Sequence, residues 1–133
     1  MGADLENKNK IMVKKEEKSV QIGRKGEDRV AEHLSEKGYT IIKRNFRTKF
    51  AEIDIIAKNN NTICFVEVKN WAHYSMDNLG YSVNKVKQKK ILNCAKEFLY
   101  KEKKYRNFHI RFDLAFSDNS EKVRILTNAF GEG

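Results

Sequence analysis

The chain has 133 residues, with 27 Lys and Arg against 18 Asp and Glu, which gives a formal net charge of +9. This length suits one domain with a single hydrophobic core and excludes two such domains. A strongly basic balance favours a polyanionic partner, of which nucleic acid is the commonest. A soluble basic domain with a solvated surface has the same composition, so charge alone leaves both open.

Several features exclude the membrane and secreted classes of protein. The sequence has no run of 18 or more apolar residues, and its N-terminus lacks the apolar segment of a signal peptide. Its two cysteines, Cys64 and Cys94, are isolated, which fits buried thiols in a reducing compartment better than a disulfide framework or a zinc site. We therefore expect a cytoplasmic protein with no membrane partner.

The first half of the chain predicts one helix and three strands. Residues 1–18 mix Lys, Glu and Asn and predict a disordered leader, which leaves residues 19–133 for the folded domain. A helical pattern begins near Ser19 and has a stop signal at Gly38. A strand is expected at residues 39–46, followed by strands at 50–56 and 65–69 joined by the polar hairpin loop 58–62.

The second half predicts one more helix and two more strands. Residues 70–82 are expected to form a loop, in which Trp71 and Tyr74 either stack on an unpaired base or pack onto the domain. A helix is expected over about 83–101, an alternating strand over 108–116 and a last strand over 123–130. This order predicts an α/β fold: a single domain with a mixed central β-sheet flanked by α-helices.

Ionisable residues interrupt two of the apolar strands. Glu52 and Asp54 lie two apart in one strand, as do Glu67 and Lys69 in the next, and strand residues two apart point to the same face. A carboxylate inside an apolar strand costs free energy unless it is paired or binds a cation. An acid followed, after a gap, by acid-x-Lys is the spacing of a metal-dependent nuclease centre. A buried Glu–Lys pair without catalytic purpose is the alternative.

Glu27 lies at the centre of the apolar stripe of the first helix. Together with Asp54 and Glu67 it would supply the oxygen ligands that a hard divalent cation such as Mg²⁺ prefers. The cation would polarise a phosphoryl oxygen and lower the pKa of an attacking water. Lys69 would orient or deprotonate that water, or stabilise the charged transition state. Glu52 would exchange roles with Asp54 or pair with Arg44 or Arg47.

The basic surplus is concentrated in residues 83–107, which hold nine Lys or Arg and two acids. Lys85, Lys89 and Lys96 lie opposite the apolar stripe of the second helix, where they would track a phosphate backbone or form a solvated face. Lys87 falls within that apolar stripe, and the ordinary explanation for such a lysine is that its tip reaches water.

The motifs resemble, in their order along residues 20–130, those of the YraN family of small bacterial proteins. The matching segments are Gly23-x-x-Gly26-Glu27, Gly38-Tyr39, Arg44-Asn45 with Arg47, Glu52–Ala57, Phe65–Lys69, Lys87-Gln88, Arg111–Asp113 and Asn128–Phe130.

This family is similar to the wider PD-(D/E)xK nucleases, including archaeal Holliday junction resolvases. The resemblance implies a restriction-endonuclease-like fold, with Glu27, Asp54, Glu67 and Lys69 at the catalytic site and Lys87 and Gln88 nearby. We therefore expect an endonuclease that depends on Mg²⁺ or Mn²⁺ and hydrolyses DNA rather than RNA, with branched DNA as a candidate substrate. Its expected metal ligands are Asp54, Glu67 and Glu27, and its expected nucleic-acid contacts are Arg44, Lys85, Lys87, Gln88 and Lys89.

Two other classes of function stay open at this point. One is a catalytically silent nucleic-acid-binding module that uses the basic helix at 83–107, and the other is a protein-interaction domain whose charges only confer solubility. A homodimer is a further candidate, on the sole analogy that resolvase-like enzymes cutting two strands symmetrically are commonly dimers.

Overall fold

The structure is a computed structural model that describes residues 25–70, 84–117 and 122–131. Residues 25–36 form an N-terminal helix. The other elements are β1 (Thr40–Arg47), β2 (Glu52–Asn59), β3 (Thr62–Asn70), α2 (Lys85–Lys101), the short 3-10 helix η3 (Lys103–Tyr105), β4 (His109–Ser117) and β5 (Val123–Phe130). The expected leader at 1–18, and Trp71 and Tyr74 of the expected loop, lie outside the described residues.

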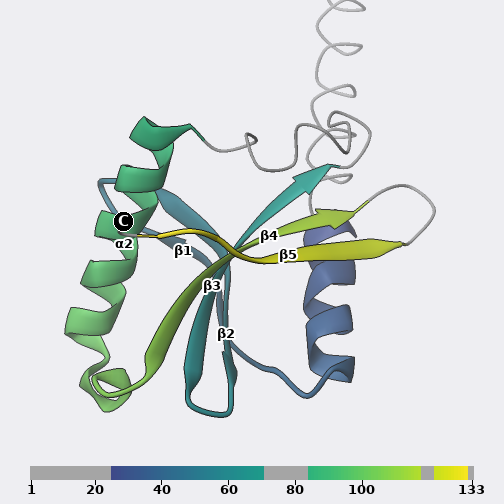
Figure 1. The fold of residues 1–133 in the computed structure, drawn as a ribbon, viewed down its shortest axis with the longest axis horizontal. Coiled ribbons are helices and arrows are strands. Elements are labelled where there is room, and N and C mark those ends of the chain that lie inside the picture. The colour runs from purple at the N-terminus through teal and green to yellow at the C-terminus, as the bar shows by residue number, and fades with distance from the viewer. Residues whose placement is uncertain (1–24, 71–83, 118–121, 132–133) are drawn as a thin grey trace, which may run out of the picture.

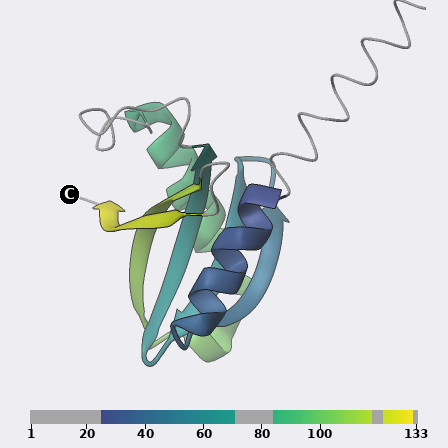
Figure 2. The same cartoon turned by 90° about the vertical axis from the view of Figure 1, so that its right-hand side faces the viewer.

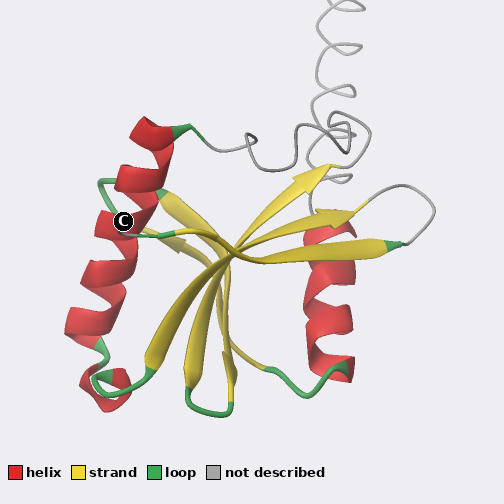
Figure 3. Ribbon diagram, viewed as in Figure 1, coloured by secondary structure: helices red, strands yellow, loops and turns green. Residues whose placement is uncertain are grey.

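The strands form one mixed sheet with the order β1-β2-β3-β4-β5. All neighbouring strands are antiparallel except β3 and β4, which are parallel because the chain returns through α2 between them. The N-terminal helix and α2 lie on opposite sides of the sheet. In Figure 1 the sheet stands between α2 on the left and the N-terminal helix on the right, and in Figure 2 the N-terminal helix is in front. Figure 3 separates the two helical layers from the strands by colour. The expected α/β fold with a mixed sheet is thus confirmed.

Each face of the sheet has its own apolar cluster. On the α2 side, Ile91, Cys94 and Phe98 of the helix pack with strand residues such as Phe65 and Phe116. On the other side, Val30 and Leu34 of the N-terminal helix pack on residues such as Val66. These helix residues recur at intervals of three or four, so the periodicity of the sequence correctly located both buried faces.

Local signals in the sequence fix the ends of the helices. The N-terminal helix stops at Gly38, which has a φ of 93° that non-glycine residues rarely adopt, and the Tyr39 N–H donates back to the Leu34 carbonyl at 2.9 Å. Helix α2 begins after Asn84, whose side chain caps the helix by accepting a hydrogen bond of 2.9 Å from the Lys87 N–H.

The hairpin between β2 and β3 is tighter than its sequence indicated. Asn59 pairs with Thr62, which leaves only Asn60 and Asn61 as the turn, whereas the polar run predicted a loop over 58–62. Asn60 has a φ of 53°, a conformation that asparagine tolerates better than most residues and that two-residue hairpins require. Both strands are therefore longer than expected, since polar residues at their ends still form strand pairs.

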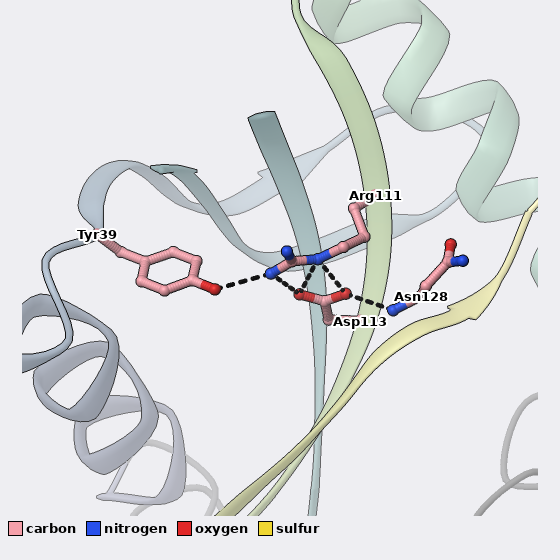
Figure 4. A network of polar contacts seen from close by, with 4 residues as sticks. All are labelled: Tyr39, Arg111, Asp113 and Asn128. Atoms are coloured by element: carbon pink, nitrogen blue, oxygen red, sulfur yellow. Dashed lines mark hydrogen bonds and ion pairs between the residues drawn. The ribbon is translucent and has the colours of Figure 1, made fainter. Parts of the chain in front are cut away.

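An ion pair within β4 links this strand to β5 and to Tyr39, the residue before β1 (Figure 4). The fully buried Asp113 accepts two hydrogen bonds of 2.9 Å from Arg111, one to each carboxylate oxygen. Its Oδ1 also accepts the Asn128 N–H of β5 at 2.8 Å, and Arg111 Nη2 donates to the Tyr39 hydroxyl at 2.8 Å. The β4–β5 register shifts between Phe112 and Leu114, so Asp113 satisfies backbone where regular pairing is interrupted.

Candidate active site

The candidate site forms where β3 separates from β2. β3 pairs with β4 along its whole length, but its last pair with β2 is between Val66 and Ile55. Beyond this point the side chain of Asp54 replaces the missing strand partner: its Oδ2 accepts a hydrogen bond of 2.7 Å from the Val68 N–H. At this point the two strands are therefore connected through a side-chain carboxylate and not through backbone strand pairing.

β2 also changes its packing at Asp54. Ile53 packs in the cluster on the α2 side, whereas Ile55, two residues later, packs in the cluster of the N-terminal helix. In a regular strand these two side chains would share a face. The regular alternation of side chains is therefore interrupted in this segment. The prediction that Glu52 and Asp54 share a face assumed that alternation. Asn45 of β1, with a φ of 53°, lies opposite Asp54 between the pairs Arg44–Ile55 and Phe46–Ile53.

Glu67 on β3 is held by two lysines. Its Oε1 lies 3.3 Å from Lys69 Nζ on the same strand and 3.0 Å from Lys87 Nζ on α2. The Glu67 and Lys69 side chains are only 11% and 13% exposed, while that of Lys87 is 44% exposed. The sequence correctly predicted that Glu67 and Lys69 share a face. For the core-facing Lys87 the sequence left two explanations, a tip that reaches water and a position near the site implied by the resemblance, and the structure pairs it with Glu67.

Asp54 and Glu67 open onto one pocket of about 690 Å³. The start of α2 supplies the facing wall, so carboxylates and ammonium groups meet across the same space. The residues that line it are Ala51, Glu52, Asp54, Glu67, Asn84, Lys85, Val86, Lys87 and Lys90.

Glu27 and Glu52 flank Asp54 and are bridged by Asn45. With its amide oriented to satisfy its hydrogen bonds, Asn45 Nδ2 lies 3.1 Å from Glu27 Oε2 and 3.1 Å from Glu52 Oε1. Of the two partners considered for Glu52, the structure selects Arg47, at 2.7 Å. Arg44 pairs instead with acids of the N-terminal helix, Asp28 at 2.7 Å and Glu27 at 3.6 Å.

The crowding of acids changes their protonation. Burial, with the nearby charge of Glu67, raises the pKa of Asp54 to about 7, although the Val68 N–H opposes the shift. Burial also raises the pKa of Glu27, partly offset by Arg44. Both carboxyl groups are therefore harder to ionise than free ones, because the site is poorly solvated and holds several acids.

The pKa values of Lys69 and Lys87 are shifted in opposite directions. Burial, together with the contact to Lys87, lowers the pKa of Lys69. Burial acts against the charged form of Lys87 too, but its hydrogen bonds to Lys69 and Glu67 raise the pKa of Lys87 overall. Lys87 is therefore the more firmly charged of the two.

Within the described ranges, no three Asp, Glu, His or Cys side chains form a ready-made metal cage. The acids near the pocket are already engaged: Glu67 by lysines, Asp54 by a backbone amide, and Glu27 and Glu52 by Arg44, Asn45 and Arg47. Mg²⁺, however, usually keeps several waters and needs one or two carboxylates. Asp54 and Glu67, which share the pocket, fit such a hydrated ion and do not fit a fully caged one.

The five expected nucleic-acid contacts lie in three different places. Lys85 and Lys87 line the pocket with Asp54 and Glu67, whereas Gln88 and Lys89 line a neighbouring groove on α2. Arg44 lines neither hollow and acts within the structure as the ion-pair partner of Asp28. The bridging role of Asn45 was missed, although an asparagine inside an expected strand is a visible signal for an unusual backbone conformation, since Asn adopts a positive φ more readily than most residues.

Comparison with known proteins identifies the family. The model of Uncharacterised protein family UPF0102 matches residues 26–116. The chain belongs to UPF0102. This confirms the resemblance to the YraN family, and the matched segment contains Glu27, Asp54, Glu67, Lys69 and Lys87.

Several UPF0102 proteins align over most of their length. The chain is 36% identical over 124 residues to the UPF0102 protein of Treponema denticola, covering 84% of this chain and 95% of that protein. It is 42% identical over 113 residues to the UPF0102 protein of Desulfosudis oleivorans, covering 83% and 89%. The corresponding values for Nitrobacter winogradskyi are 38% over 108 residues, 81% and 90%.

In this UPF0102 chain, neither helix of the described ranges combines the length and the apolar character needed to cross a bilayer.

Proposed function

We propose that this protein is a metal-dependent endonuclease that hydrolyses DNA phosphodiesters, with branched DNA as a candidate substrate. The observation that carries the proposal is the shared pocket, in which Asp54 and Glu67 face Lys85 and Lys87 where β3 leaves β2. Asp54 and Glu67 would hold Mg²⁺ or Mn²⁺, with Glu27 supporting them through its position beside Asp54. The bound cation would polarise a phosphoryl oxygen and acidify water.

The lysines complete the proposed chemistry. Lys69 is held 3.3 Å from Glu67, where its ammonium would orient the attacking water and stabilise the charged transition state. In its neutral form, the same amine would accept the proton of the water, whose oxygen forms the new bond to phosphorus. The departing strand oxygen takes a proton from solvent. Lys87, half-exposed at the pocket, stabilises the negative charge on the phosphoryl oxygens.

The test is cleavage of labelled linear and four-way-junction DNA with Mg²⁺, Mn²⁺ or EDTA. Wild type is compared with Glu67→Gln and with Glu36→Gln, which removes the same charge from an exposed position of the N-terminal helix. Metal-dependent cleavage that Glu67→Gln loses and Glu36→Gln keeps supports the proposal. If neither substrate is cut, or Glu67→Gln cuts as well as wild type, the proposal is wrong.

A second candidate is a nucleic-acid-binding module that cleaves nothing. The observation in its favour is that the acids around the pocket are already paired, while helix α2 carries six lysines and one glutamate. This candidate predicts salt-sensitive DNA binding that does not change with Mn²⁺ or with Glu67→Gln.

Two further proposals concern the location of the protein in the cell and its oligomeric state. Cys64 and Cys94 are both buried and free, which supports a location in the reducing cytoplasm. A homodimer would present two pockets to the two strands of a junction, and sedimentation of the purified protein tests it.

A further inference from the structure

A second hollow lies on the outward side of α2 and adjoins the pocket. It has a volume of about 400 Å³, and its lining includes Gln88, Leu92 and Asn93 together with Gly131, which follows β5. Lys85 lines both the pocket and this groove, so the two hollows meet at that side chain. No carboxylate contributes to the groove lining among the residues that the structure describes. The three lysines of the lining, Lys85, Lys89 and Lys96, are called the groove lysines below.

The groove lysines form a straight row along the helix. Positions 85, 89 and 96 fall within about 40° of one another at 100° per residue, opposite the buried Cys94 and Phe98. At about 1.5 Å per residue, the row extends about 16 Å along the helix axis. This is the length of about five nucleotides of one strand in a DNA duplex.

The charges of α2 are poorly arranged for the stability of the helix itself. Four of its first six residues are lysines, and its first turn has no acidic residue. Positive charges near a helix N-terminus oppose the macrodipole. Lys87 is paired with Glu67, but Lys85, Lys89 and Lys90 form no ion pair within the described part of the chain. A bound polyanion would offset this unfavourable arrangement of positive charge.

We propose that the groove binds the sugar–phosphate backbone of a nucleic-acid strand that continues from the pocket. The groove lysines neutralise successive phosphates, and the side-chain amides of Gln88 and Asn93 donate hydrogen bonds to phosphate oxygens. Placing the scissile phosphate in the pocket rests on the proposed nuclease function. The substrate class is then a polynucleotide that extends about five nucleotides beyond the cleaved bond, bound without regard to base sequence.

The test measures binding of a fluorescent 12-nucleotide DNA to the full chain in EDTA at several salt concentrations. The groove variant carries Lys89→Gln and Lys96→Gln. The control variant carries Lys25→Gln and Lys37→Gln, which remove the same charge from exposed positions outside the groove and outside residues 83–107. We expect about tenfold weaker binding for the groove variant. Its slope of log affinity against log salt should fall by about 1.4, since each lost contact to a single strand contributes about 0.7. The control variant should bind like wild type.

Equal weakening in both variants would overturn the groove, because net charge would then explain the binding. Binding of poly-glutamate as tightly as the DNA would also overturn it, in favour of an acidic polypeptide partner.

Hydrolysis of the small diester bis(p-nitrophenyl) phosphate by wild type with Mn²⁺ reports the proposed nuclease activity separately. Selective weakening of DNA binding without any hydrolysis supports the groove and contradicts the nuclease. Hydrolysis with unchanged DNA binding by the groove variant contradicts the groove alone.

Discussion

Asp54 accepts a hydrogen bond from the Val68 N–H at 2.7 Å, at the point where β3 has left β2. The bond satisfies a backbone amide that would otherwise lack its strand partner. It also fixes one carboxylate oxygen of Asp54 beside β3, on which Glu67 and Lys69 lie. The separation of β3 from β2 therefore determines where the candidate site lies, because it places Asp54 beside Glu67 and Lys69.

Asp54→Asn should stabilise the metal-free protein more at pH 8 than at pH 5. The folded protein raises the pKa of Asp54 from 3.8 to about 7, so it holds this proton more tightly than the unfolded chain does. The stability that Asp54 contributes is thus greatest at low pH and falls as the pH rises from about 4 to 7. The asparagine keeps an acceptor for Val68 and removes the buried charge. Urea unfolding in EDTA should show a gain about 2 kcal/mol larger at pH 8, and an equal gain at both pH values would contradict the raised pKa.

Lys69 and Lys87 should be strongly coupled in stability, because both neutralise Glu67 Oε1. We expect Lys87→Met to cost about 1 kcal/mol, since Lys69 still pairs with Glu67. The double variant Lys69→Met/Lys87→Met leaves a nearly buried carboxylate without a partner and should cost about 3 kcal/mol or more, exceeding the sum of the single effects. A double-mutant cycle by urea unfolding measures the coupling. Restoring stability by adding Glu67→Gln would confirm the cause, and additive effects would rule it out.

Asp113→Asn should be among the most destabilising single substitutions in the sheet. The carboxylate is fully buried, and its loss leaves Arg111 without its bidentate partner. We expect a cost of about 3 kcal/mol, compared with about 1 kcal/mol for Tyr39→Phe, which removes only the hydroxyl that accepts from Arg111. Thermal or urea unfolding of both variants checks the ranking. A smaller cost for Asp113→Asn than for Tyr39→Phe would show that the ion pair contributes little.

Cys64 should be inert in the native protein. It is completely buried, and burial raises the pKa of its thiol to about 11, so it is neither accessible nor ionised at pH 8. Ellman's reagent should react with it only as fast as the protein unfolds, and 6 M guanidinium should make the reaction immediate. Cys64→Ala identifies which of the two thiols accounts for any native signal. Rapid native labelling that disappears in this variant would mean that the sheet opens locally.

The sequence predicted those parts of the site that depend on regular periodicity. Glu67 and Lys69 were placed on one face by strand alternation alone. Helical spacing located the apolar stripes of the two helices, which hold the buried Val30, Leu34 and Phe98. Helical spacing singled out Glu27 and Lys87 as charged residues on apolar stripes, and the YraN resemblance placed them at or near the site, but neither predicted their contacts. Those contacts come from the packing of elements that are distant in the sequence.

The residues whose roles sequence reasoning missed are those that depend on irregular backbone. Asn45 and Asn128 both have a φ of 53°, and each interacts with an acid of another strand, the first through its side chain and the second through its N–H. Periodicity cannot locate such positions, since they interrupt it. Asp113 was likewise expected only as a family position, because its burial requires Arg111, Tyr39 and Asn128 to meet around it.

The most direct test of the proposed site is calorimetric titration of Mn²⁺ into the metal-free protein. Wild type and Glu36→Gln, a matched control on the N-terminal helix, should bind the ion with the same affinity. Asp54→Asn should lose at least tenfold, since it removes one of the two carboxylates that line the pocket. Equal binding by all three proteins, or no binding by any of them, would contradict the assignment of Asp54 and Glu67 as a metal site.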